Sequence, residues 1–138
     1  LFIILSGLNI ASATDKNVTS KITVSKLHSE GDVYVQVVEL DKKNQWQHYE
    51  QMFKINNSKI AHTTEFKLEL TSNKHYGMRI FQDINKNQQL DMTDTGIPLE
   101  PVGFSQNPSL VNGIPPLSDC QFTAGESIEI NMKWRKKK

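Results

Sequence analysis

Apolar side chains alternate with polar ones along several stretches of this chain, and this period of two most constrains how it can fold. In the C-terminal stretch, for example, Ile128, Ile130 and Met132 are separated by polar residues. Successive side chains of a β-strand point to opposite faces of a sheet, so the pattern is typical of strands with one buried face. The alternation predicts strands within residues 22–25, 33–38, 66–70, 75–81 and 128–134.

Helical periodicity is weak throughout, so we predict an all-β protein. Residues 45–53 are ambiguous, because their aromatic side chains lie three and four positions apart and would fit a short helical turn or an irregular connection. Strands of this length joined by polar turns favour an antiparallel sandwich of two sheets. The residues predicted to lie between the sheets are Val35, Val37, Leu68, Met78, Ile80, Ile128 and Ile130.

Residues 91–121 interrupt the alternation. They contain all five prolines of the chain and three of its seven glycines. We expect one long Pro/Gly-rich loop that is ordered and runs over one end of the sandwich. Loops of this length in compact domains are usually functional or clamped in place.

The first 13 residues are uncharged and mainly apolar, and they end in small residues at Ala11 and Ala13. A signal peptidase cleaves after such a pattern, and the run is too short to span a bilayer. We interpret residues 1–13 as a signal peptide remnant and residues 14–138 as a single β-sandwich domain that is secreted or periplasmic. No transmembrane segment is expected in the mature chain. The alternative is that residues 1–13 begin with a hydrophobic first strand.

Charge and cysteine content exclude some classes of partner and of stabilisation. The 16 basic and 15 acidic side chains give a net charge of +1, so composition does not indicate a nucleic-acid partner. Cys120 is the single cysteine, so no disulfide can form within the chain. No histidine lies near it in sequence, and we predict that it is a small buried hydrophobe.

Residues 83–94 have the side-chain spacing of a calcium loop, with oxygen-bearing residues at positions one, three, five, nine and twelve. Gln88 stands where a glycine would take a left-handed turn at no steric cost, so we expect weak affinity, on the order of 10⁻⁴–10⁻³ M. The alternative is an Asx-rich turn that caps its own backbone without a metal. The predicted calcium ligands are the side chains of Asp83, Asn85, Asn87, Asp91 and Asp94 and the backbone carbonyl of Gln89.

Most of the mature chain resembles a known family, with the most specific blocks between Tyr76 and Trp134 and a fitting opening within residues 22–40. An aromatic strand runs into residues 81–87 (Phe-Gln-Asp-Ile-Asn-Lys-Asn), and Leu-Asp, Gly-Ile-Pro, Gly-Phe-Ser and Gly-Ile-Pro-Pro blocks follow in order before a last strand. This order is similar to the bacterial exported proteins grouped as domain-of-unknown-function 2141. The resemblance implies a prealbumin-like or immunoglobulin-like sandwich with no established catalysis. The chain departs from the family at Lys86 and Gln88, where glycine is common.

Two classes of function fit these observations. The first is an exported, non-catalytic module with a weak calcium site, which binds an unknown protein, peptide or glycan partner or acts in envelope structure. The alternative is a small secreted or periplasmic hydrolase or transport accessory with a cleft under residues 91–121. No catalytic residue is assigned, because Ser105 lacks the final glycine of a nucleophile elbow and no two histidines have the spacing of a helical zinc pair.

Structure should distinguish these two classes. A deep pocket in which Glu100, Asp119 or the loop acids converge would favour an enzyme. A shallow face lined by aromatic residues would favour binding. The aromatic residues considered for such a face are Trp46, Tyr49 and Phe104.

Overall fold

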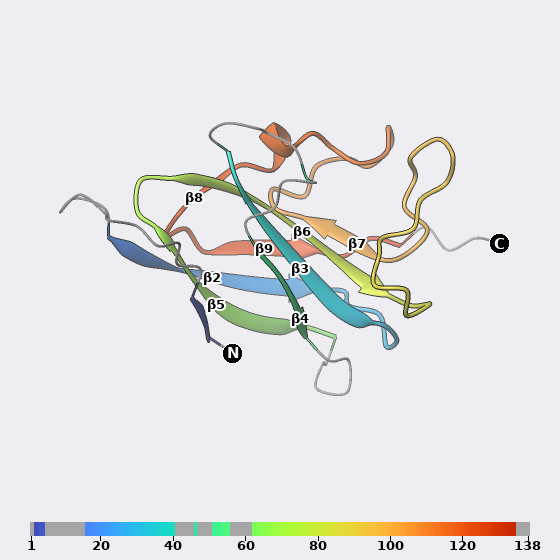
Figure 1. The fold of residues 1–138 in the computed structure, drawn as a ribbon, viewed down its shortest axis with the longest axis horizontal. Helices are drawn as coiled ribbons and strands as arrows, with labels where there is room; N and C mark the ends of the chain where they lie inside the picture. The colour runs from blue at the N-terminus through green and yellow to red at the C-terminus, as the bar shows by residue number, and fades with distance from the viewer. Residues whose placement is uncertain (1, 5–15, 41–45, 47–50, 56–61, 135–138) are drawn as a thin grey trace.

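The computed structural model describes residues 2–4, 16–40, 46, 51–55 and 62–134, which form two β-sheets and one 3-10 helix (Figure 1). The described strands are β1 (Phe2–Ile4), β2 (Asn17–Ser25), β3 (Asp32–Glu39), β4 (Gln51–Ile55), β5 (Thr64–Thr71), β6 (His75–Asp83), β7 (Val102–Phe104), β8 (Phe122–Thr123) and β9 (Ile128–Asn131). The 3-10 helix, η3, spans Leu117–Cys120. The prediction of an all-β protein is therefore confirmed.

The two sheets are built from strands that are mostly distant in sequence. Sheet A has the order β1-β5-β2-β9, and sheet B has the order β4-β3-β6-β7 with β8 also paired to β6. Most pairings are antiparallel, but β9 is parallel to β2 and β1 is parallel to β5. The expectation of a wholly antiparallel arrangement is wrong at these two places. Parallel neighbours need a long connection, and residues 26–127 provide it between β2 and β9.

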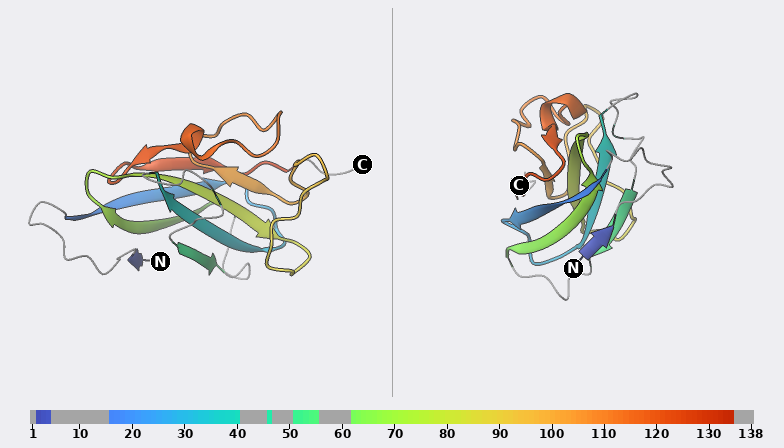
Figure 2. Two further views of the ribbon diagram at one scale, coloured as in Figure 1. Left: turned by 45° about the horizontal axis from the view of Figure 1, so that its top comes forward. Right: turned by 90° about the vertical axis from the view of Figure 1, so that its left-hand side faces the viewer.

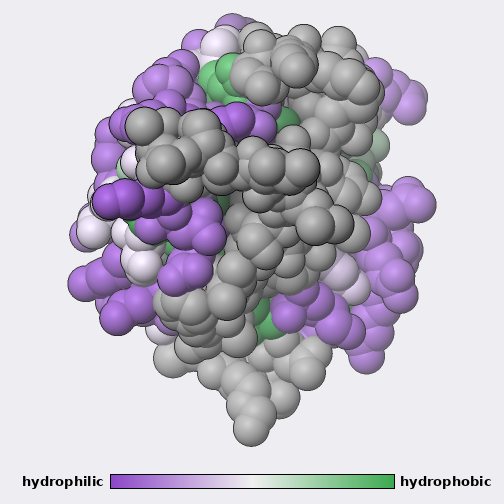
Figure 3. Space-filling model, turned by 60° about the vertical axis from the view of Figure 1, so that its left-hand side comes forward, coloured by the Kyte–Doolittle hydropathy of each residue, from purple (hydrophilic) through white to green (hydrophobic). Residues whose placement is uncertain are grey.

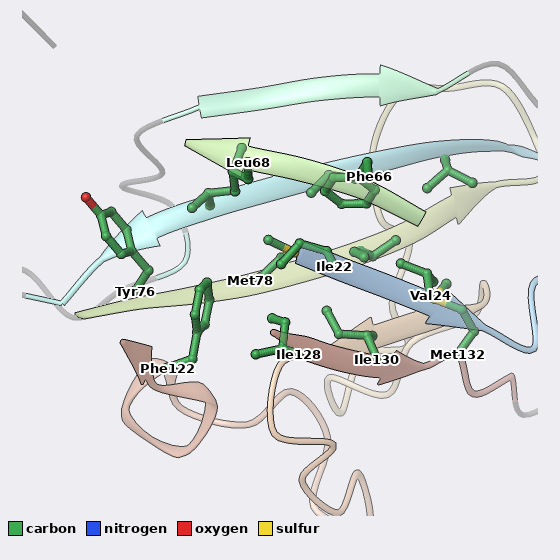
Figure 4. Packing of buried hydrophobic residues seen from close by; sticks show 14 of the residues in the cluster. Ile22, Val24, Phe66, Leu68, Tyr76, Met78, Phe122, Ile128, Ile130 and Met132 are labelled. Carbon is green, nitrogen blue, oxygen red and sulfur yellow. The ribbon is translucent and has the colours of Figure 1, made fainter. Parts of the chain in front are cut away.

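The two sheets pack face to face over an apolar core, which is consistent with a sandwich (Figure 2). Val35 of β3 pairs with Ile80 of β6, and Ile22 of β2 pairs with Phe66 of β5, so each register places apolar side chains on the inner face. Figure 4 shows that side chains from both sheets point toward one another. All seven residues predicted to lie between the sheets are buried.

Sheet B is buried on its other face as well. Tyr34 and Val38 of β3 and Phe81 of β6 point away from the inter-sheet core, and Leu117 and Trp46 cover them. A side chain in place of Gly77 would collide with Leu117, so glycine allows this covering segment to approach β6 closely. We call this second cluster the outer cluster, and its buried members are Tyr34, Val38, Trp46, Phe81, Val102, Phe104, Leu117 and Cys120.

The expectation of one long loop over residues 91–121 is not confirmed. Strand β7 divides this stretch, because it pairs with β6 through Arg79↔Phe104 and Phe81↔Val102. One segment, residues 84–101, extends beyond the end of β6, and another, residues 105–121, lies against the outer face of sheet B (Figure 1). The alternation missed β7 because both of its faces are buried.

Two other segments were ambiguous in the sequence. Of residues 45–53, Gln51–Phe53 belong to strand β4 and residues 47–50 lie outside the described residues. At the N-terminus, Phe2–Ile4 pair with β5, and residues 1 and 5–15 lie outside the described part.

The face of the molecule in Figure 3 is mainly hydrophilic where its residues are described, with small hydrophobic patches. Among the described residues, no helix has the length and apolar character needed to cross a membrane.

Candidate functional site

The predicted calcium loop begins where β6 ends, at a buried carboxylate. Asp83 is 3% exposed, and its two oxygens accept the backbone N–H groups of Asn87 at 3.1 Å and of Gln88 at 2.8 Å. These bonds hold a tight turn in which Lys86 and Gln88 both adopt left-handed backbone conformations, with φ of 62° and 66°. Gln88 therefore has the left-handed backbone that glycine adopts at no steric cost, as expected from the sequence.

The side chains of Asn85, Asn87 and Asp91 meet on the exposed side of this turn. The Asn85 amide nitrogen donates to Asp91 Oδ2 at 2.5 Å, and the Asn87 amide nitrogen donates to Asp91 Oδ1 at 2.7 Å and Oδ2 at 2.9 Å. The Asn85 and Asn87 side-chain oxygens accept backbone N–H groups of Asn87 and Gln89, at 3.3 and 3.0 Å. These are the contacts expected of a self-capping Asx turn.

The six predicted ligands therefore do not all come together. Asp83, Asn85, Asn87 and Asp91 share one hydrogen-bond network, which also includes the backbone N–H of Gln89. Asp94 is exposed, and no hydrogen bond in the described part of the chain joins its side chain to this network. Over the described residues, no group of three or more His, Cys, Asp or Glu side chains is arranged to hold a metal ion.

Glu100 holds the two ends of the loop together, and the sequence did not assign it this role. Its carboxylate is 5% exposed and accepts the backbone N–H of Ile84 at 2.7 Å and that of Asp91 at 3.1 Å. Burial raises the pKa of Glu100, the two N–H donors oppose this shift, and the negative charges of Asp91 and Asp83 add to it.

The sequence contained only weak evidence that Glu100 is buried and holds the loop. It is a single acid between Leu99 and Pro101, next to the apolar strand β7, and such a charge needs partners when it is buried. Of the acids considered for convergence, Glu100 interacts electrostatically with Asp83 and Asp91, whereas Asp119 is exposed in η3.

Ser105 and Cys120, which carry nucleophilic atoms, are both buried within the fold. Ser105 is fully buried, and its hydroxyl donates to the Cys120 carbonyl at 2.5 Å and accepts the Met78 N–H at 2.9 Å. Cys120 is also fully buried, as predicted, and burial raises the pKa of its thiol to about 12. The thiol therefore stays protonated at neutral pH, and the serine hydroxyl ties β7 to β6 and η3.

Two of the three aromatic residues suggested for a binding face, Trp46 and Phe104, do not present a surface. Trp46 and Phe104 are buried and pack on each other with ring centroids 5.4 Å apart, and the Trp46 indole N–H donates to the Pro115 carbonyl at 2.9 Å. Tyr49 lies outside the described residues. These rings fix residues 105–121 onto sheet B instead of presenting a surface.

A cleft of about 260 Å³ does lie beside residues 97–110, where the alternative function would place one. Its ionisable lining residues are Glu100 and Lys133. Both Glu100 oxygens accept backbone N–H groups, and Lys133 donates to the Pro108 carbonyl at 3.2 Å. Among the described residues that line the cleft there is therefore only one carboxylate, whereas acid–base hydrolysis of a glycoside typically uses two.

No curated protein and no solved structure matches the chain. The family model described as "Uncharacterized protein conserved in bacteria (DUF2141)" matches residues 22–131, from within β2 to the end of β9. This match confirms the resemblance found in the order of sequence blocks. The chain therefore belongs to this bacterial family.

Proposed function

We propose that this protein is an exported, non-catalytic binding module in which the loop of residues 83–91 takes up one calcium ion. The observation that carries the proposal is the convergence of the Asn85 and Asn87 side-chain amides on the Asp91 carboxylate, at 2.5–2.9 Å. Ca²⁺ is bound by carboxylate, amide and backbone oxygens at about 2.3–2.6 Å, so these are suitable groups.

A cation would replace the amide N–H groups of Asn85 and Asn87 that now donate to Asp91. Rotation of an Asn amide exchanges its nitrogen and oxygen at nearly the same positions, because the two ends of the group have similar size. With both amides turned, Asn85 and Asn87 would offer oxygens to an ion beside Asp83 and Asp91, at the cost of the bonds that these oxygens now accept from the backbone N–H groups of Asn87 and Gln89. The exposed position of Asp94 and the strained turn at Gln88 support weak affinity, on the order of 10⁻⁴–10⁻³ M.

The environments of Ser105 and Cys120 support a role in binding, because the serine hydroxyl and the cysteine thiol are both buried and engaged in the fold. The apolar residues 1–13 support export. We further propose that the sandwich is of the immunoglobulin-like or prealbumin-like kind and that its two irregular segments contact a protein, peptide or glycan partner. Such segments on a rigid sheet scaffold are where binding residues commonly lie.

Thermal unfolding in calcium and in chelator tests the ion site. For a Kd near ~0.2 mM, ~2 mM calcium stabilises the fold by roughly 1.4 kcal/mol, which raises Tm by a few degrees. Asp91→Ala should abolish this shift, because Asp91 is the acceptor on which both amides converge. Asp119→Ala is the matched control, since Asp119 is an exposed acid in η3, and this variant should keep the full shift.

Equal melting temperatures in millimolar calcium and in chelator would show that the loop is a self-capping turn only. The same conclusion would follow if the Asp91 variant kept the shift.

A further inference from the structure

Arg79 occupies an unusual position on the outer face of sheet B. It lies on β6, directly opposite Gln36 of β3 and Phe104 of β7. Its neighbours on this face include Phe81, Phe104 and Trp46 of the outer cluster, so the guanidinium lies among apolar side chains and is half-buried. A charged group in such surroundings is normally paired with a carboxylate.

The contacts of Arg79 fix its orientation without neutralising its charge. Its Nε donates to Gln36 Oε1 at 2.5 Å, and its Cζ lies 5.6 Å from the centre of the Trp46 ring, within the range of a cation–π interaction. In the described part of the chain no carboxylate forms an ion pair with it, and its terminal Nη atoms have no hydrogen-bond acceptor. Burial lowers the pKa of Arg79 to about 10, so the group is still cationic at neutral pH.

A cavity of about 230 Å³ is lined in part by Arg79. Gln36, Arg79 and Phe81 line it from the sheet, and Leu90 and Met92 line it from the loop beyond β6, together with Gln88 and Gln89. Its described lining contains no acidic side chain and one basic side chain. The volume is smaller than that of pockets for drug-sized molecules, about 300–1,000 Å³, so it suits a small group.

We propose that this cavity binds the carboxylate of a small organic acid or of a peptide, with an apolar substituent against Phe81, Leu90 and Met92. The Nη atoms of a guanidinium form a planar fork that matches the two oxygens of a carboxylate. One unpaired cation balances the single negative charge of a carboxylate, whereas a phosphate dianion would require a second cation, which the described lining residues do not supply. The inference rests on the proposed binding role and names its ligand class, but it does not require calcium.

Benzoate is a suitable first probe, because it combines a carboxylate with a flat apolar ring. Titration into ¹⁵N-labelled protein should shift the indole N–H signal of Trp46, which contacts Arg79, and saturate at millimolar benzoate or below. The indole signal of Trp134, which does not line the cavity, is an internal control. Benzamide has the same shape without the charge and should not produce the shift.

Variants at Arg79 separate charge from geometry. Arg79→Gln should weaken benzoate binding at least about tenfold, since charge-assisted bidentate pairs are among the strongest hydrogen bonds. Arg79→Lys keeps the charge but loses the planar fork, and should weaken binding by a smaller factor. Lys54→Gln is the matched control, because Lys54 is an exposed cation on the same sheet that does not line the cavity. Circular dichroism melting of each variant checks that it is folded.

Two further experiments identify the source of the carboxylate and distinguish this site from the proposed calcium site. If a short peptide with a free C-terminal carboxylate competes with benzoate and its amidated form does not, the site binds peptides. If neither peptide competes, the site binds free organic acids. Benzoate binding in chelator equal to that in calcium supports this site even if the calcium proposal fails. Unchanged benzoate affinity in folded Arg79→Gln, or tighter binding of inorganic phosphate than of benzoate, would overturn the inference.

Discussion

Between the two sheets the fold is stabilised by apolar packing, whereas at the end of β6 it is stabilised by side-chain oxygens that accept backbone N–H groups. The first region contains residues such as Ile22, Val35 and Ile130, all fully buried. In the second region, Asp83 and Glu100 accept four backbone N–H groups at 2.7–3.1 Å. Apolar packing is nearly insensitive to pH and ions, but carboxylates respond to both. The stability of the β6 end should therefore depend on pH through Glu100, whereas that of the apolar core should not.

The largest effect is expected in the core. Ile130→Ala removes a side chain that is 0% exposed and packs between the sheets, so it should lower the free energy of unfolding by roughly 2–5 kcal/mol in urea denaturation. Val111→Ala is the matched control, since Val111 is 84% exposed and its truncation should change stability by no more than about 0.5 kcal/mol. A loss below about 1 kcal/mol for Ile130→Ala would mean that the core is not the principal source of stability.

The core residues could be predicted from the sequence because the alternation that marks them is visible within each strand. Val35, Leu68, Met78 and Ile130 each have polar or oppositely facing neighbours, and a period of two assigns them to one face without knowledge of the partner strand. The parallel pairing of β9 with β2 could not be predicted, because pairing between strands a hundred residues apart leaves no local pattern. Strand β7 was hidden because burial of both faces removes the alternation.

The contacts at the end of β6 could be predicted from the sequence only in part. Asx spacing located the turn, and Asp83, Asn85, Asn87 and Asp91 do share one network. Glu100 was not assigned to it, because its role depends on residues 97–101 folding back beside β6, as the Gln82 N–H bonded to the Pro101 carbonyl at 3.0 Å shows. Arg79 was also missed, since a charged residue at a strand position that alternates with Met78 and Ile80 looks like an ordinary solvent-facing side chain.

An intermediate effect is expected at Glu100. Glu100→Gln keeps the shape but replaces one acceptor oxygen by a donor, so one of the N–H groups of Ile84 and Asp91 loses its partner. Leaving a buried polar group unsatisfied costs about 1–3 kcal/mol. Asp119→Asn is the control, because Asp119 is exposed and no such contact is lost there.

The pH dependence of this cost follows from the raised pKa of Glu100. Glu100 keeps its proton to a higher pH in the folded protein than in the unfolded chain, where its pKa is near 4.5. The stability that this group contributes to the wild type is therefore fully present below pH 4.5 and decreases as the pH rises through the folded-state pKa. Glutamine does not titrate. The cost of Glu100→Gln, measured as the difference in unfolding free energy from wild type, should therefore be larger at pH 4 than at pH 7. A cost that grows with pH would contradict the direction of the shift.

The smallest effect is expected at Gln88, and its sign is the informative part. Gln88 has φ of 66°, a backbone conformation that costs a residue with a side chain about 1–2 kcal/mol. Glycine avoids this cost, but its greater freedom in the unfolded chain lowers stability by about 0.5–1 kcal/mol. Gln88→Gly keeps the backbone N–H that bonds to Asp83, so it should stabilise the protein by about 0.5–1 kcal/mol. Gln121→Gly is the matched control: Gln121 is also exposed but has φ of −67°, so the same substitution should destabilise. Opposite signs in urea denaturation would show that the turn stores backbone strain, a form of energy absent from the apolar core. Destabilisation by both substitutions would remove that distinction between the two regions.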